Sequence, residues 1–224
     1  MKQVTENIWV IPSEVKVAPG VYLPLQSTLV RLSDGALWLH SPVRLSASDI
    51  TEIKALGDVT HLVAPNLMHH LYFGDAVQAF PKARTYGAPG LTKKRPDLRF
   101  DEKLSSETQF PGIRSFFVDG APALRETMFV HEDETLISAD IFQNNHTPKN
   151  WLSKMTCVMA GTSEQVGVSR LLQMVVKDKP KFKEGVDQVM AASFGRLIPC
   201  HGEIVEFEAK ARCRSACNRV NWLL

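Results

Sequence analysis

The most informative stretch of the sequence is Val59-Thr60-His61-Leu62-Val63-Ala64-Pro65-Asn66-Leu67-Met68-His69-His70. In it an apolar strand runs directly into potential metal ligands, as at the strand ends of a layered α/β domain. A second apolar run, residues 136–139, ends at Asp140. A third, residues 196–200, ends at His201. The carboxyl ends of strands in a layered α/β domain meet at a crevice, where short loops hold side chains on a rigid base. The sequence therefore predicts a site at one edge of a sheet.

The residue types at these strand ends favour a metal. Imidazole nitrogens and a carboxylate suit zinc or iron. The predicted ligands of one divalent metal are His69, His70, Asp140 and His201. Zinc is the favoured ion, with iron, manganese or no metal as alternatives. Each residue also has a local alternative, because His and Asp are common at the ends of helices, strands and turns.

Length and composition limit the classes of protein to which the chain can belong. The 224 residues, 44% of them hydrophobic, can bury a large core, and we expect one domain over residues 1–224. The net charge of +2 argues against a dominant nucleic-acid surface. The N-terminus lacks the apolar core of a secretory signal, and no apolar run approaches the roughly 20 residues needed to span a bilayer. We expect a cytoplasmic protein with a small-molecule substrate and neither a nucleic acid nor a membrane as partner, and a homodimer remains one option.

Strand and helix patterns alternate along the chain. Strands are expected at residues 7–11, 27–32, 36–40, 59–65, 83–86, 113–118, 127–131 and 135–139, with a short one ending at His201. Helices are expected from the capping box at Ser46 to Gly57, at 71–80, across 151–190 with breaks near Gly161 and Asp178, and at 205–220. Strands in two sets with helices between and after them predict an α/β fold of two mixed β-sheets packed together, with helices on both outer faces.

Several short motifs, in this order and spacing, resemble the metallo-β-lactamase superfamily, and more closely a branch of it with a Pro-Asn-x-x-His-His motif. They are Leu39-His40-Ser41-Pro42, Ala64 to His70, Phe80-Pro81-Lys82-Ala83, Ala88-Pro89-Gly90-Leu91, Leu136 to Asp140, and Cys200-His201-Gly202. The resemblance implies a four-layer αββα sandwich with metal ligands on loops at one edge of the sheets.

The family's His-x-His-x-Asp-His signature falls on Pro65, Leu67, His69 and His70. Its first two histidines are therefore absent, and histidine replaces aspartate at the third ligand position. The family's middle histidine, expected near residues 118–121, is missing as well.

The remaining family positions are present. The bridging aspartate of the family matches Asp140, and its last histidine matches His201. The resemblance thus implies a degenerate dinuclear site, in which the ligands of one metal are largely lost while His69, His70, Asp140 and His201 could hold the other. Two-metal hydrolysis is doubtful in such a site, because one metal cannot reproduce the clamp that two metals form around the reacting oxygens.

Three further residues are candidates for the site. His40 ends a strand at the place where the superfamily usually carries an aspartate, and it could orient a ligand, bind substrate or shuttle a proton. Asn66 could hold a substrate oxygen, or close an Asx-type turn before the two histidines. We name His40 and Asn66 as candidate catalytic residues. His146 follows Asp140 on a loop, where it could replace a missing ligand or lie exposed on the surface.

Signatures of other enzyme classes are absent: the sequence has no G-x-S-x-G, no G-x-x-x-x-G-K and no H-E-x-x-H. We predict a mononuclear metal-dependent hydrolase that acts on a small ester, amide, thioester or phosphate. One alternative is a non-catalytic family member that serves binding or assembly. Another is a mononuclear iron oxidoreductase, since imidazole and carboxylate ligands also suit oxygen chemistry.

Overall fold

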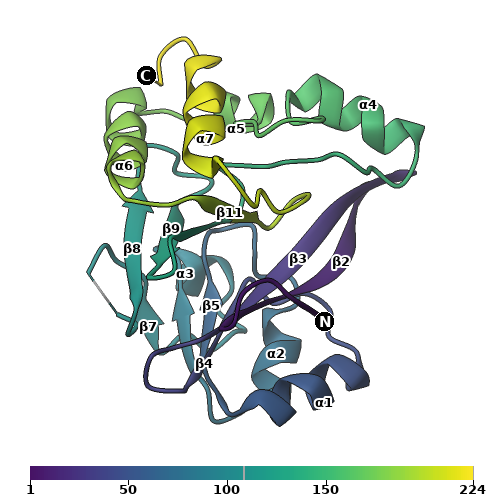
Figure 1. The fold of residues 1–224 in the computed structure, drawn as a ribbon, viewed down its shortest axis with the longest axis vertical. Helices are drawn as coiled ribbons and strands as arrows, with labels where there is room; N and C mark the ends of the chain where they lie inside the picture. The colour runs from purple at the N-terminus through teal and green to yellow at the C-terminus, as the bar shows by residue number, and fades with distance from the viewer. Residues whose placement is uncertain (108, 224) are drawn as a thin grey trace.

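The protein is described by a computed structural model that covers residues 1–107 and 109–223. These residues form two mixed β-sheets with helices on their outer faces, as predicted (Figure 1). The first sheet has the order β1 (Lys2–Gln3), β2 (Ile8–Ala18), β3 (Val21–Arg31), β4 (Leu37–His40), β5 (Val59–Ala64), β6 (Arg84–Gly87) and β7 (Glu102–Lys103). Its first four strands are antiparallel, and the pairings from β4 to β7 are parallel.

The second sheet has the order β11 (Arg196–Pro199), β10 (Thr135–Ser138), β9 (Glu126–His131) and β8 (Ile113–Val118). The strands β8, β9 and β10 are antiparallel, and β11 pairs parallel to β10. In this parallel pairing Ser138 lies opposite Pro199, the last residue of its strand. Asp140 and His201, each two residues further along, are therefore carried to the same edge of the sheet.

Helices complete the four layers. The helices α1 (Ala47–Leu56), α2 (Phe73–Ala79) and α3 (Leu91–Lys94) pack on the first sheet through a core that includes Leu39, Leu62 and Phe73. The helices α6 (Lys179–Ala191) and α7 (Ala209–Asn218) cover the second sheet. A third core between the sheets contains Trp38 and Phe129. The predicted αββα sandwich is confirmed. The helix α4 (Trp151–Ala160) lies beside the start of β3, at the tip of the β2–β3 hairpin, and α5 (Arg170–Val175) lies between α4 and α7 (Figure 1).

Local chemistry explains the element boundaries that the sequence predicted well. Ser46 caps α1: its side chain accepts from the backbone N–H of Asp49, whose side chain accepts in turn from the backbone N–H of Ser46. Gly57 follows the helix with a φ of 149°.

The hairpin of β2 and β3 is longer than predicted. Strands were expected at 7–11 and 27–32, but they extend as a continuous pair to a turn at Pro19 and Gly20. In the part of β2 beyond Ile11 only Ser13 and Val15 are partly buried, while the other residues, Glu14, Lys16 and Val17 among them, are exposed, and this weak pattern concealed the strand. The extension matters because its apolar side chains form one wall of a pocket.

The last predicted helix also begins later than expected, at Ala209 instead of Val205, because Val205 forms a β-bridge with Leu197. In the part of the chain that the structure describes, no helix combines the length and the apolar character required to cross a membrane.

Candidate metal centre

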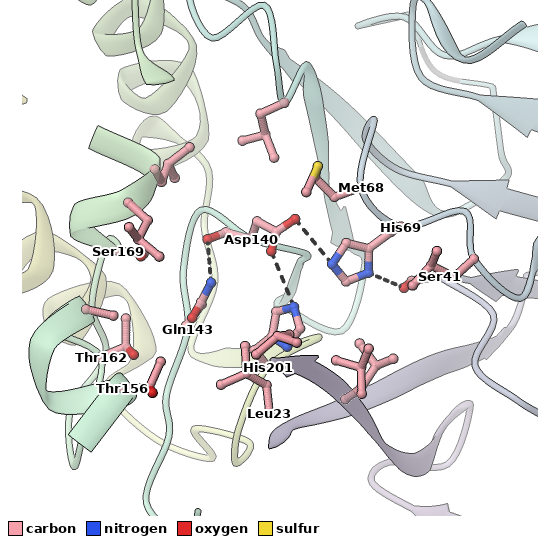
Figure 2. Close-up of a pocket in the computed structure, with 18 of the residues that line it drawn as sticks. Leu23, Ser41, Met68, His69, Asp140, Gln143, Thr156, Thr162, Ser169 and His201 are labelled. Atoms are coloured by element: carbon pink, nitrogen blue, oxygen red, sulfur yellow. Dashed lines mark hydrogen bonds and ion pairs between the residues drawn. The ribbon is translucent and has the colours of Figure 1, made fainter. Parts of the chain in front are cut away.

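Three of the four predicted ligands converge at the edge where β5, β10 and β11 end. One ligand atom from each of His69, Asp140 and His201 lies within 4.8 Å of the other two. His69 Nε2 is 3.2 Å from Asp140 Oδ2, and His201 Nε2 is 3.3 Å from Asp140 Oδ1. The aspartate thus stands between the two imidazoles, with one oxygen turned to each (Figure 2).

The ring orientation of His201 is fixed by a backbone carbonyl. Its Nδ1 lies 2.8 Å from the carbonyl oxygen of Pro24 on β3. A carbonyl only accepts hydrogen bonds, so Nδ1 carries the proton in this contact. Nε2 is then the nitrogen that can serve as a metal ligand when the ring is neutral.

The His69 ring is held in the same way from its other side. Its Nδ1 is 2.6 Å from the hydroxyl of Ser41, which follows β4 with a φ of 50° (Figure 2). Asn66 sets the backbone of His69, because its side-chain oxygen accepts from the N–H groups of Met68 at 2.8 Å and His69 at 2.9 Å. This is the Asx-type turn considered for Asn66.

Asn66 is a positioning residue and is fully buried. Its amide nitrogen donates to Asp140 Oδ2 at 2.7 Å and to Glu126 Oε2 at 3.1 Å. The same side chain therefore joins the loop of His69 to the carboxylate of Asp140. Asn66 does not line the pocket, so the structure supports its loop-holding role over direct contact with a substrate oxygen.

Glu126, at the start of β9, anchors the loop of Asp140 from below. Its carboxylate accepts from the backbone N–H groups of Ala139 at 2.9 Å and Asp140 at 2.8 Å, and from the Ser138 hydroxyl at 3.1 Å. Burial and the neighbouring Asp140 charge raise the pKa of Glu126. The sequence analysis missed this residue, although an acidic side chain directly before the strand predicted at 127–131 was the available signal.

The histidines set the electrostatics of Asp140. Burial alone would raise the pKa of Asp140, but the charge of His69 and the hydrogen bonds from His69 and His201 outweigh it and hold the pKa well below its usual range. The site therefore presents an ionised carboxylate to any bound cation.

His70 does not join the other three, contrary to the prediction. Its Nδ1 is 2.8 Å from a guanidinium nitrogen of Arg95, and it does not line the pocket that the other ligands reach. Adjacent side chains in this tight loop point to different sides, and the turn at Asn66 directs His69 inward. Burial, followed by the charges of Lys94 and Arg95, lowers the pKa of His70.

His40 lies in the interior beneath the site. Its ring is fully buried, stacks on Trp38 with centroids 5.3 Å apart, and places Nδ1 3.8 Å from the sulfur of Cys200. Burial, followed by the charge of His69, lowers the pKa of His40 well below its ordinary value. His40 does not line the pocket, so direct contact with substrate, one of the roles considered for it, is not supported.

His146 is exposed, and its Nε2 is 2.9 Å from the side-chain oxygen of Asn144. It does not belong to the ligand group found among the described residues. The loops after β10 and β11 are nevertheless joined tightly: Gly202 has a φ of 98°, and a Cβ there would lie 2.0 Å from the carbonyl oxygen of Asn144. Only glycine fits this close contact beside His201.

A pocket of about 430 Å³ opens at the three ligands. Its walls come from the β2–β3 hairpin, the loop after β5, and α4 and α5. Figure 2 shows His69, Asp140 and His201 grouped together, with Thr156 and Ser169 across the pocket from His69. The volume is within the range of pockets that bind small molecules.

The three residues form a candidate metal site. Two donors bound to one zinc at about 2.1 Å with tetrahedral angles lie about 3.4 Å apart. The contacts of Asp140 with the two histidines, 3.2 Å and 3.3 Å, are of similar length, although each uses a different carboxylate oxygen. The positions that carry the first two histidines in the family signature, Pro65 and Leu67, have no side-chain donor. The three converging residues therefore offer two imidazoles and one carboxylate to a metal at the edge of the pocket.

Comparison with solved structures identifies the fold as that of the metallo-β-lactamases. A metallo-β-lactamase from Erythrobacter litoralis superposes with a TM-score of 0.68 at 12% identity, covering 98% of this chain and 96% of its own. The enzyme from Pontibacter korlensis gives 0.65 at 13% identity, with 96% of both chains covered. FIM-1 from Pseudomonas aeruginosa, solved in its mono-zinc form, gives 0.65 at 12% identity over 97% of this chain and 94% of its own.

The sequence itself matches one family, a domain of unknown function named DUF4336, over residues 5–92. That segment contains His69 and ends before Asp140 and His201. No curated protein matches the chain.

Proposed function

We propose that the protein is a hydrolase of a small-molecule substrate that depends on one divalent metal, zinc in the first instance, held by His69, Asp140 and His201. The convergence of three donors beside a pocket carries this proposal. Catalytic zinc sites combine three protein ligands with an open position, whereas structural sites are closed by four. The mono-zinc form of FIM-1 is an example of this fold with a single zinc.

A bound divalent metal would polarise a carbonyl oxygen and lower the pKa of a water molecule. The protein's own residues prepare the rest of the site. Ser41 and the Pro24 carbonyl hold the two rings so that both Nε2 atoms face Asp140. Asp140 supplies the carboxylate that lines the pocket and that would hold the metal together with the two rings.

The experiment is a chelation and reconstitution assay on protein prepared without a polyhistidine tag. Hydrolysis of neutral esters and thioesters should disappear after chelation and return with zinc, iron or manganese. His69→Ala should abolish the restored activity, whereas its neighbour variant His70→Ala should keep it. Hydrolysis that is indifferent to chelation, or absent with every metal, would contradict the proposal and favour a binding or assembly role.

A second candidate is a mononuclear iron oxidoreductase, because two imidazoles and one carboxylate with open positions form the ligand set of non-haem iron oxygenases. Iron that co-purifies with the protein and supports oxygen consumption, in place of metal-restored hydrolysis, would favour it.

A further inference from the structure

The walls of the pocket are apolar beyond the three ligands. They include Val15, Leu23, Leu25, Met68, Leu124 and Leu172, contributed by segments far apart in the chain. The polar side chains in the wall, such as Thr156 and Ser169, are uncharged. Among the described residues that line the pocket, Asp140 and the two histidines are the sole ionisable groups apart from a tyrosine and a cysteine.

This wall has no lysine or arginine to receive an anionic group. Two cations near the pocket have partners outside its lining or behind it: Lys94 donates to the backbone carbonyl of Leu67, and the Arg44 guanidinium, which does not line the pocket, lies 5.5 Å from the ring centroid of Tyr72. Away from the three ligands, a carboxylate or phosphate would therefore be desolvated against hydrocarbon without a side-chain counter-charge. We therefore expect the part of the substrate that lies against these walls to be neutral.

The mouth of the pocket is also apolar and faces solvent. Val17, Met68, Leu71 and Leu171 all line the pocket, and each is at least half exposed, from 51% for Val17 to 64% for Leu171. Exposed apolar side chains gathered around a concave site mark a binding surface. They extend the apolar path from the ligands to the protein surface, as a long flexible apolar group requires.

We propose that the site takes a neutral acyl substrate with a long apolar chain, an ester, thioester or amide. The chain lies between the β2–β3 hairpin and α5, and the carbonyl carbon lies at His69, Asp140 and His201. The reaction rests on the hydrolase function proposed above. Water adds its oxygen to the carbonyl carbon, the bond from that carbon to oxygen, sulfur or nitrogen breaks, and the leaving group departs with a proton, giving a carboxylic acid.

The test measures binding of the chain separately from catalysis. Neutral 2-alkanones, from butanone to decanone, carry the carbonyl and the chain but cannot be hydrolysed. They are used to displace the neutral fluorescent dye Nile red from the purified protein. Each methylene that enters the pocket should tighten binding about threefold to fourfold. A flat response across the series would overturn the inference.

Two residues on α5 provide a matched pair of variants. Leu171 lines the pocket and is 64% exposed, whereas Met174, three residues further on, is 73% exposed and does not line it. Leu171→Asp should weaken binding of decanone by about tenfold or more, since a charge at the mouth opposes an apolar chain. Met174→Asp should leave it unchanged. Equal losses in both variants would place the ketone on the outer helix surface and overturn the inference.

The His69→Ala variant separates this inference from the proposed hydrolase function. It should lose metal-restored hydrolysis and keep the dependence of ketone binding on chain length. Wild-type protein that shows the chain-length dependence but no hydrolysis with any metal would refute the hydrolase while supporting the apolar binding pocket.

Discussion

Histidines lie at or after strand ends both at the edge of the sheets and in the interior just beneath that edge, but their rings have different surroundings in the two regions. At the edge, His69 and His201 each have Nδ1 held by an oxygen, and Nε2 faces Asp140. Beneath it, His40 stacks on Trp38, is fully buried and does not reach the pocket. A histidine at a strand end therefore becomes a candidate ligand when a second group orients its ring toward an open space.

Removing the carboxylate should have the largest effect at the edge. Asp140→Ala deletes a proposed ligand and the carboxylate that faces both imidazoles, so metal affinity should fall by more than about 100-fold, beyond the 10–100-fold typical of residues that only support ligands. Competition with a chromophoric chelator measures this affinity. A loss below tenfold would mean that the aspartate is not a ligand.

Removing Glu126, the buried residue that anchors the loop of Asp140, should lower the stability of the protein. Glu126→Ala removes the acceptor of one Asn66 amide hydrogen and of the N–H groups of Ala139 and Asp140, and should cost about 2–4 kcal/mol of unfolding free energy. For a chain of this size that corresponds to a Tm lower by roughly 5–15 °C. Thermal unfolding followed by circular dichroism measures it.

Glu206 provides the control for that experiment. It pairs with Arg196 at 3.0 Å, and its side chain is 45% exposed. Glu206→Ala should change the unfolding free energy by less than about 1 kcal/mol, because solvent screens exposed pairs. Similar losses for both glutamates would show that Glu126 does not anchor the edge.

Removing the ring support of His69 tests positioning alone. Ser41→Ala deletes the hydroxyl 2.6 Å from His69 Nδ1. Metal affinity should fall by about 10–100-fold with little change in Tm. Ser46→Ala is the control: it removes the cap of α1, and should lower stability by about 1 kcal/mol without changing metal affinity. The interpretation fails if the two serine variants bind metal equally.

The smallest effect is expected in the interior. His40→Phe keeps an aromatic ring against Trp38 and Phe129 and deletes two nitrogens that do not face the pocket. Metal affinity should change by less than about threefold, below the range for supporting residues. A drop as large as that of Ser41→Ala would mean that His40 takes part in the site and would remove the contrast between the two regions.

The sequence predicted the layers of helices and sheets, and the sheet edge where the candidate ligands meet, because these features depend on local patterns. The buried strand β5, the capping box at Ser46 and the polar residues after β10 and β11 are all visible in short stretches. The choice between His69 and His70 was not visible, since it depends on a turn at Asn66 and on Arg95, 25 residues away.

The residues that hold the candidate ligands in place were also hard to predict, because they are distant from those ligands in the sequence. Ser41, Glu126 and the Pro24 carbonyl act across 14 to 177 residues of sequence, and no spacing rule connects them to the ligands. His131, beside the acidic run Glu132-Asp133-Glu134, is only 3% exposed, with Nδ1 2.9 Å from Asp133 Oδ1. A side chain of an acidic turn can thus pair with the last residue of the preceding strand, and that residue can be buried.

We propose that His69, Asp140 and His201 hold one metal and that His70 is not one of its ligands. The most direct measurement is elemental analysis of untagged wild-type, His69→Ala and His70→Ala proteins, with metal counted per chain and folding verified by circular dichroism. We expect about one metal per chain in the wild type and in His70→Ala, and none in His69→Ala. Equal occupancy in the two variants, or no metal in the wild type after incubation with zinc, iron or manganese, would contradict the claim.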